Sequence, residues 1–248
     1  MNRGVVTSLF LAVALLAFIS CRQERQSVYT GVERHKVFIL TETQGYRHES
    51  IGAGIAMFAN HATEWNIEPE YCTETAAMTK QDMHIYSVIV LLNTTGSLFD
   101  EAEKGVLQDF VRKGGAVLAI HAAADAEYDW PWYAAMLGGQ FDNHPEIQQA
   151  NCIVANHYHP VSLGIPGVWT RTDEWYNFKN LSPENDVVIT IDEATYSGGT
   201  NGTRHPISWC REFDGGRVFY TAMGHTNETY SEPLFQQHIK NALHWLIQ

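Results

Sequence analysis

Residues Gly114–Asp125 read G-G-A-V-L-A-I-H-A-A-A-D, and this stretch decides the predicted fold. A glycine pair comes first, followed by the apolar run Ala116–Ile120, then His121 and three alanines. A short apolar run between turn signals is typical of a strand covered on both faces, as in a parallel sheet. Ligands of open α/β sheets bind beyond the carboxyl ends of the strands. His121 stands at such an end, although a lone histidine there is more often simply packed and hydrogen-bonded.

Strand and helix patterns alternate on both sides of this stretch. Apolar runs predict further strands at 36–41, 86–93, 151–156, 186–191, 206–213 and 217–221, and a weaker pattern predicts one at 67–72. Helical spacing predicts helices at 51–65, between Ser97 and Gly114, at 129–137 and from Ser231 onward. Ser50 can cap the first helix, and Ser97 and Asp100 have the spacing of a capping box. This order favours one α/β domain with a mostly parallel central sheet and helices on both faces.

The first residues have the pattern of a targeting segment. Residues 1–20 combine one positive charge with an apolar run, which is typical of a secretory signal peptide. The segment F-I-S-C at 18–21 resembles the lipobox of bacterial lipoproteins and implies a lipid on Cys21. An uncleaved membrane anchor is the alternative, but the run is short for a full span. We expect a flexible tether at 21–34 and a folded domain at 35–248, held in the cell envelope as a periplasm-facing lipoprotein.

Composition narrows the range of partners. The formal net charge of −12 disfavours nucleic acid as a partner. The chain has no glycine-rich dinucleotide fingerprint, so we expect no nucleotide cofactor. Cys72, Cys152 and Cys210 are widely spaced and odd in number, which indicates buried free thiols. The many aromatic residues, with 7 Trp, 11 Tyr and 11 Phe, supply a core and also suit stacking against sugars.

Histidines gather where predicted strands end. His48, His121 and His225 each follow a strand, and His144 lies in the turn F-D-N-H-P. In a parallel sheet these side chains converge on one cleft. Residues 173–176, D-E-W-Y, add two carboxylates beside aromatic rings. These carboxylates are either solvated loop charges, or a general base or a group that orients a histidine.

The same residues are compatible with two kinds of chemistry. Converging imidazoles and a carboxylate can hold a divalent metal such as zinc, with His121, His144 and His225 as candidate ligands. Their spacing matches no recognised local metal motif. Metal-free acid–base catalysis uses the same side chains, because histidine titrates near neutral pH. The sequence leaves both alternatives open.

Several motifs together resemble one known family. They are T-E-T-Q-G-Y-R-H-E-S-I, G-G-A-V-L-A-I-H-A-A, G-G-Q-F-D-N-H-P, H-P-V-S-L-G-I-P, T-D-E-W-Y, H-P-I-S-W and G-R-V-F-Y-T-A-M-G-H. Their order and their span over nearly all of 36–248 are similar to the ThuA-like proteins, named for trehalose utilisation. The resemblance implies a flavodoxin-like fold similar to class I glutamine amidotransferases. Residues 119–123, A-I-H-A-A, stand where those enzymes carry their nucleophilic cysteine, so glutaminase chemistry is disfavoured.

The resemblance also implies work on disaccharides that have been oxidised to 3-keto sugars. We expect an enzyme that removes a proton beside the carbonyl of a 3-keto sugar or 3-keto-disaccharide, in an isomerase, lyase or hydrolase step. The catalytic candidates are His48, His121, Glu174 and His225. The candidates for binding the sugar are Tyr46, Arg47, Trp130, His144, Trp175 and Tyr176. The alternative is a tethered carbohydrate-binding protein without turnover, in which the rings of Trp130, Trp132, Trp175, Tyr176 and Trp209 stack on sugars.

Overall fold

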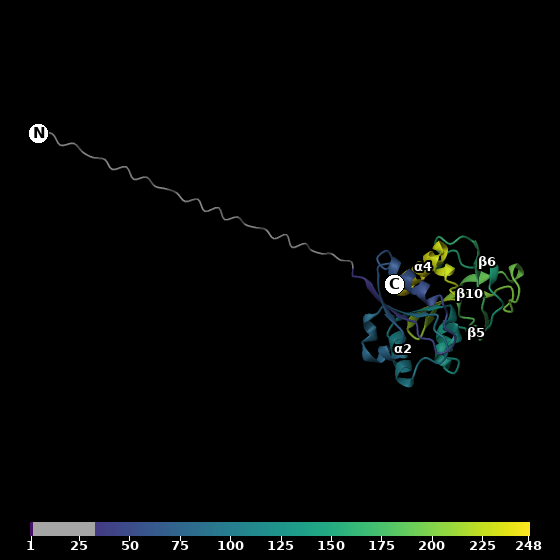
Figure 1. The fold of residues 1–248 in the computed structure, drawn as a ribbon, viewed down its shortest axis with the longest axis horizontal. Helices are drawn as coiled ribbons and strands as arrows, with labels where there is room; N and C mark the ends of the chain where they lie inside the picture. The colour runs from purple at the N-terminus through teal and green to yellow at the C-terminus, as the bar shows by residue number, and fades with distance from the viewer. Residues whose placement is uncertain (2–32) are drawn as a thin grey trace. The chain divides into compact units, whose positions relative to one another are not determined.

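The computed structural model describes Met1 and residues 33–248 of the chain (Figure 1). The predicted signal peptide, most of the tether and the lipid site at Cys21 therefore lie outside the described residues. Residues 33–248 form a single unit, in which no helix is both long and apolar enough to cross a bilayer.

A nine-stranded sheet forms the centre of this unit. In spatial order its strands are β2 (Ile67–Cys72), β1 (His35–Leu40), β3 (Val88–Leu92), β4 (Ala116–Ile120), β11 (Gly216–Thr221), β10 (Pro206–Phe213), β9 (Asp186–Ile191), β6 (Gln148–Val154) and β7 (Val168–Asp173). The strands from β2 to β11 pair in parallel, and every pair from β11 to β7 is antiparallel. The prediction of a mostly parallel sheet is therefore only partly right, because the sheet is mixed. The change occurs at the hairpin between β10 and β11, where Asp214 and Gly215 adopt the positive φ of a tight turn.

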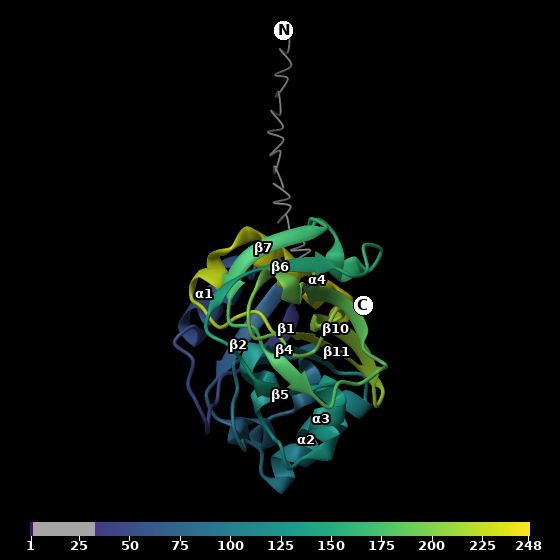
Figure 2. The same ribbon diagram turned by 90° about the vertical axis from the view of Figure 1, so that its right-hand side faces the viewer.

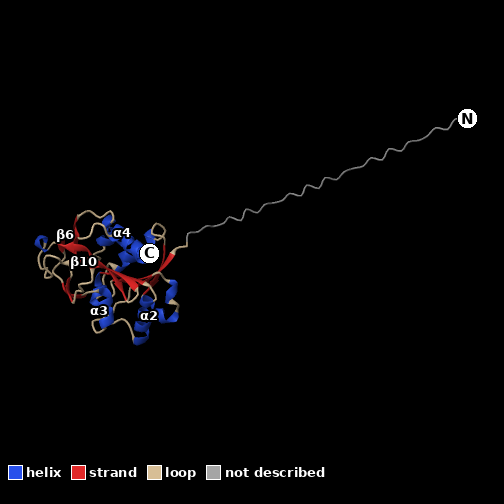
Figure 3. Ribbon diagram, turned by 180° about the vertical axis from the view of Figure 1, so that it is seen from behind, coloured by secondary structure: helices blue, strands red, loops and turns tan. Residues whose placement is uncertain are grey.

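Helices cover both faces of the parallel half. Figure 2 shows α1 (Ile51–His61) and α4 (Pro233–Ile247) on one side of the sheet, and α2 (Glu101–Arg112) and α3 (Pro131–Leu137) on the other. Figure 3 shows the same layering from behind, with the strands between α4 and the pair α2 and α3. All residues of β3 and β4 are buried as a result. Their unbroken apolar sequences are what a strand covered on both faces requires.

Three strands of the structure are not predicted from the sequence. Strands β5 (Gln140–Asn143) and β8 (Asn177–Lys179) form a separate small antiparallel sheet, and β7 is the edge strand of the main sheet. The buried positions of β7 are Trp169, Arg171 and Asp173, so two of its three inward side chains are charged. The alternation of apolar and polar residues that identifies a strand is therefore hidden in β7.

Two local predictions need correction. The capping box of α2 is formed by Asp100 and Glu103, three residues after the predicted start at Ser97. Asp100 accepts a hydrogen bond from the Glu103 backbone N–H, and Glu103 accepts one from the backbone N–H of Asp100. Cys152 and Cys210 are buried free thiols as expected, whereas Cys72 at the end of the edge strand β2 is only half-buried.

Candidate active site

Four side chains from separate parts of the chain meet at one edge of the sheet. His48 follows β1, His121 follows β4, and His225 follows β11, and these parallel strands end at the same edge. Glu174 follows β7, which reaches the site from the antiparallel half. Each of the four offers one ligand atom, and these atoms all lie within 4.8 Å of one another. We refer to these four residues as the histidine–glutamate cluster.

Glu174 is the hub of this arrangement. Its Oε2 atom lies 3.4 Å from His121 Nε2 and 3.1 Å from His225 Nδ1, and these two ring nitrogens are 3.3 Å apart. Its other oxygen, Oε1, lies 3.1 Å from Nδ1 of His144. The side chain of His144 is 42% exposed, whereas that of Glu174 is 7% exposed. The carboxylate thus joins the buried cluster to a histidine that solvent can reach.

The backbone of His121 is unusual. Its φ is +48°, a left-handed conformation that costs an ordinary residue about 1–2 kcal/mol. His121 opens a short 3₁₀ turn directly after β4, and Ala122, Ala123 and Ala124 follow it in that turn. The turn points the ring at Glu174, and the Ala222 carbonyl lies 2.6 Å from Nδ1. A sharp, strained turn at a strand end is typical of functional sites.

The contact with Ala222 determines which nitrogen of His121 carries hydrogen. A carbonyl oxygen can only accept, so Nδ1–H of His121 donates to Ala222 O. In the neutral ring the lone pair of Nε2 then faces the Glu174 carboxylate 3.4 Å away. Two acceptors that face each other repel unless a cation lies between them. That cation is either a proton on the imidazole or a metal ion.

Burial and neighbouring charges divide the protonation states of the cluster. Burial, together with His121 and His225, lowers the pKa of His48 to about 3, so His48 is neutral. Burial would raise the pKa of Glu174, but the neighbouring imidazoles of His121 and His225 hold it well below its usual value. Burial would lower the pKa of His225, but the hydrogen bond to Glu174 raises it. The site therefore contains an ionised carboxylate and a neutral imidazole side by side.

The donor set fits a divalent metal such as zinc. Tetrahedral zinc with nitrogen and oxygen ligands places those ligand atoms about 3.3 Å apart, close to the separations among Glu174, His121 and His225. Histidine ligands commonly donate their second N–H to a carbonyl, as His121 does to Ala222. Nδ1 of His48 is buried without a hydrogen-bond partner among the described residues. Of the predicted ligands, His121 and His225 lie in the cluster, while His144 contacts it through Glu174 and His48 takes the further position.

Two of the predicted sugar-binding residues, Tyr46 and Tyr176, pack against cluster rings, and a third, Arg47, precedes His48 in the chain and bonds elsewhere. The Tyr46 ring is 64% exposed and packs edge-on against His48, with ring centroids 4.9 Å apart. Arg47 is exposed and donates from Nη1 to the Thr41 carbonyl at 3.3 Å. Tyr176 lies against His121 at 4.2 Å between ring centroids, and it is buried.

Two other predicted sugar-binding residues lie in the interior. Trp175 is fully buried, and its Nε1–H donates to the Gln148 carbonyl at 2.8 Å. Trp130 packs against Phe99 and Tyr133, and none of its ring contacts among the described residues involves the cluster. Neither indole presents an open face to a sugar in this structure.

The supporting role of Asp173 is not predicted from the sequence. Asp173 is fully buried, and its carboxylate accepts hydrogen bonds from the backbone N–H groups of Glu174, Gly224 and His225. The sequence shows two adjacent carboxylates, of which only Glu174 is a predicted catalytic residue. Their separation into a contact residue and a buried support depends on β7 meeting the loop after β11, which no local pattern encodes.

Comparison with known proteins agrees with the fold and the motifs. The family model described as ThuA, trehalose utilisation, matches residues 36–246. The chain belongs to this family. A ThuA-like protein from Bacteroides uniformis superposes with a TM-score of 0.73 at 22% identity, covering 89% of this chain and 94% of that one. A ThuA-like protein from Parabacteroides merdae gives 0.73 at 18% identity, covering 87% and 90%. No curated protein matches the chain.

A third structure shows how far the fold extends. A cytoplasmic protein from Salmonella typhimurium LT2 superposes with a TM-score of 0.64 at 14% identity, covering 86% of this chain and all, 100%, of that one. At such identities the likeness concerns the fold alone. Membership of the ThuA family gives this chain a role in sugar metabolism.

Proposed function

We propose that this protein is an enzyme that acts on a 3-keto sugar or 3-keto-disaccharide by removing a proton beside the carbonyl. Membership of the trehalose-utilisation family supports the sugar. The observation that carries the chemistry is the contact of Glu174 with His121 and His225 through one oxygen and with His144 through the other. A carbonyl acidifies the neighbouring C–H, and a base of near-neutral pKa can then take the proton.

His144 is the side chain best placed to act as that base. Its Nδ1 lies 2.9 Å from the Pro145 carbonyl and 3.1 Å from Glu174 Oε1, and both of these oxygens are acceptors. Nδ1 therefore carries the hydrogen in the neutral ring, and the lone pair is on Nε2. Because the side chain is 42% exposed, Nε2 can reach a substrate that lies over the cluster. Glu174 orients the ring and stabilises the imidazolium that forms.

The histidine–glutamate cluster accounts for the other half of the reaction. When Nε2 of His144 takes the proton, the electron pair of the broken C–H bond moves toward the carbonyl oxygen and gives an enolate. His48, His121, His225 and Glu174 would hold the divalent ion, which supplies Lewis-acid stabilisation of that negative oxygen when bound. In a metal-free site, a protonated His225 would donate a hydrogen bond to the same oxygen. Isomerisation, epimerisation and elimination of the glycosidic bond share this step.

Product analysis tests the proposal. The purified protein is incubated with trehalose, sucrose and their 3-keto derivatives, and the products are identified. We expect turnover of a keto derivative and none of the parent sugars. Replacing the hub by Glu174→Gln, or the base by His144→Ala, should lower turnover by at least about a hundredfold. Binding of the sugars without any conversion would contradict the enzyme and support the carbohydrate-binding alternative, which the exposed ring of Tyr46 also suits.

A further inference from the structure

Asp173 connects the two halves of the histidine–glutamate cluster. Its Oδ1 atom accepts from the backbone N–H of Glu174 at 3.0 Å and from that of His225 at 3.1 Å. Its Oδ2 atom accepts from the backbone N–H of Gly224 at 3.0 Å and from the Thr229 hydroxyl at 3.0 Å. One carboxylate thus holds the backbone of Glu174, on the β7 side, and the backbone of His225, on the β11 side.

The loop after β11 is also held from the opposite side. The Gly224 carbonyl accepts hydrogen bonds from the Ser50 hydroxyl at 3.0 Å, the Asn93 amide at 3.2 Å and the Tyr230 hydroxyl at 3.0 Å. Asp173 binds the N–H of the same glycine. Gly224 has a φ of +130°, which an ordinary side chain rarely allows. The position of the next residue, His225, is therefore defined by buried polar groups on both sides of its neighbour.

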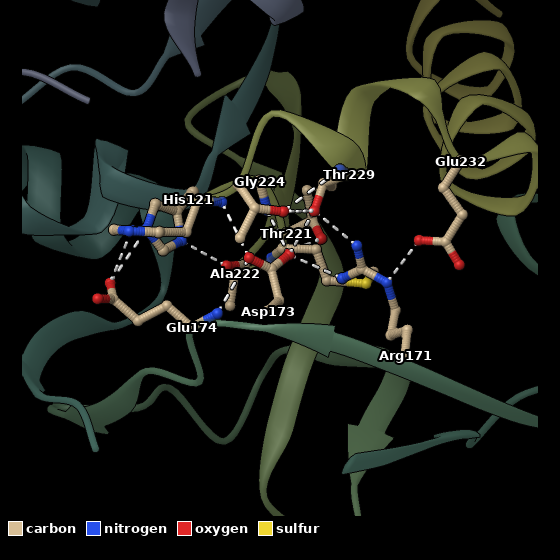
Figure 4. Close-up of polar contacts among 12 residues, drawn as sticks. His121, Arg171, Asp173, Glu174, Thr221, Ala222, Gly224, Thr229 and Glu232 are labelled. Carbon is tan, nitrogen blue, oxygen red and sulfur yellow. Dashed lines mark hydrogen bonds and ion pairs between the residues drawn. The ribbon is translucent and has the colours of Figure 1, made fainter. Parts of the chain in front are cut away.

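A buried cation balances the charge of Asp173. Figure 4 shows Arg171 between Asp173 and Glu232. The Arg171 guanidinium donates to Asp173 Oδ2 and to Glu232 Oε2, each at 2.8 Å, and to the Thr229 hydroxyl at 2.8 Å. Burial would raise the pKa of Asp173, but Arg171 lowers it, so the carboxylate is ionised. Burying charged groups costs folding free energy, and packed apolar side chains in the same place would avoid that cost. The buried ion pairs therefore indicate a role other than stabilising the fold.

We propose that Asp173 is the positioning residue of the candidate active site: it clamps Glu174 and His225 at the separation that the site requires. What the site does rests on the proposed function, whereas the clamp rests only on the hydrogen bonds of Asp173 to the backbones of Glu174 and His225. Among the described residues, no hydrogen bond of the Asp173 carboxylate goes to a side chain of the cluster. It acts through the backbone of Glu174 and His225, and the 3.1 Å contact between His225 Nδ1 and Glu174 Oε2 depends on it.

The Asp173→Asn variant tests the clamp with two measurements that do not need a substrate. The added NH₂ group faces N–H donors, so hydrogen bonds to Gly224 or His225 are lost while the volume is kept. The first measurement is the dissociation constant for Co²⁺ alone, with its visible absorption spectrum. We expect the constant to rise at least about tenfold and the spectrum to change. The second is hydrogen exchange of the Gly224 and His225 amides, which should become at least about tenfold faster.

Matched variants separate positioning from plain stability. Ser208→Ala removes a buried hydrogen bond to His238, 3.0 Å long, away from the cluster. It should lower the melting temperature while Co²⁺ affinity and the two amides stay as in the wild type. If Asp173→Asn does not fold, Thr229→Val removes one bond to Asp173 and should raise the Co²⁺ dissociation constant about two- to tenfold.

The possible outcomes distinguish a failure of the clamp from a failure of metal binding. Unchanged amide exchange in Asp173→Asn, or loosened amides with Co²⁺ affinity within about twofold of the wild type, would overturn the clamp. A wild-type chain that does not bind Co²⁺ would instead count against the metal-binding part of the proposed function. The amide comparison then still decides the role of Asp173.

Discussion

His121 combines a strained backbone with a buried functional ring. It is fully buried, and its positive φ is a conformation that glycine adopts without steric cost and other residues do not. A fold that needed only a filler at this turn would be better served by glycine. The strained backbone is therefore explained by the need for an imidazole at this position, where the ring contacts Glu174 and Ala222.

This reasoning gives a prediction at the residue scale. His121→Ala and His121→Gly both remove the ring, so both should fold and lose at least about a hundredfold in turnover of a keto sugar. Because glycine relieves the strain, His121→Gly should be about 1 kcal/mol more stable to unfolding than His121→Ala. Urea unfolding and turnover are measured on the same preparations. Near-wild-type turnover in either variant would show that the histidine serves the fold alone.

The capping of α2 gives a prediction at the element scale. Asp100→Ala removes the acceptor for the Glu103 backbone N–H, so it should lower the free energy of unfolding by about 1 kcal/mol. Ser97 is exposed and lies before the helix, so Ser97→Ala is the matched control and should change little. Chemical denaturation of the two variants decides between the caps. A larger loss from Ser97→Ala would restore the cap predicted from the sequence.

The packing of α4 on β10 gives a prediction about pH. His238 of α4 is fully buried beside Ser208 of β10, and burial lowers its pKa to about 3. Below about pH 6.5 the unfolded chain binds a proton at this histidine, whereas the folded chain binds one only near pH 3. The free energy of unfolding therefore decreases as the pH is lowered from about 6.5 to about 3. From pH 7 to pH 5, His238 should lower the free energy of unfolding by about 2 kcal/mol.

Two variants measure this contribution. His238→Gln should reduce the pH dependence of unfolding between pH 7 and pH 5, and His48, whose pKa is also about 3, should account for part of what remains. His157 is exposed, so His157→Gln should leave the dependence unchanged. Denaturation curves at both pH values give the comparison. An equal loss of stability in His238→Gln and in the wild type would show that His238 is not the group responsible.

Local sequence patterns predict most strands of the main sheet. Strands β2, β4, β9 and β10 have the predicted bounds, because their own residue types or the turn residues that flank them mark the strand in the sequence. Strand β7 could not be predicted, because its inward residues Arg171 and Asp173 are charged and are paired only in the folded chain. The first helix also ends at His61, short of the predicted 65, since helical spacing persists beyond the last helical residue.

The same distinction applies to the candidate site. His48, His121 and His225 could be predicted, because parallel strands bring their carboxyl ends to one edge. Glu174 was a candidate only through its motif, and its role as the hub depends on the antiparallel half of the sheet. Ser50 begins α1 as predicted, but its hydroxyl donates to the Gly224 carbonyl and makes no side-chain cap. Contacts of this kind between distant segments have no local signature.

At the scale of the whole molecule, residues 33–248 contain the complete cluster. We propose that Cys21 is lipidated and holds the domain at a membrane that faces the periplasm. The basic start and the apolar run before Cys21 support this proposal. Mass spectrometry of the membrane fraction should find a lipid on Cys21, and Cys21→Ala should lose it. An intact Met1 on the membrane-bound protein would count against lipidation.

The central claim is that this site removes a proton beside a sugar carbonyl. The most direct measurement is incubation of 3-keto-trehalose with the protein in D₂O, with deuterium in the sugar and its products followed by NMR. We expect deuterium at a carbon next to the carbonyl, at a rate that His144→Ala lowers by at least about a hundredfold and His244→Ala on α4 leaves unchanged. A keto sugar that binds but gains no deuterium and gives no product would contradict the claim.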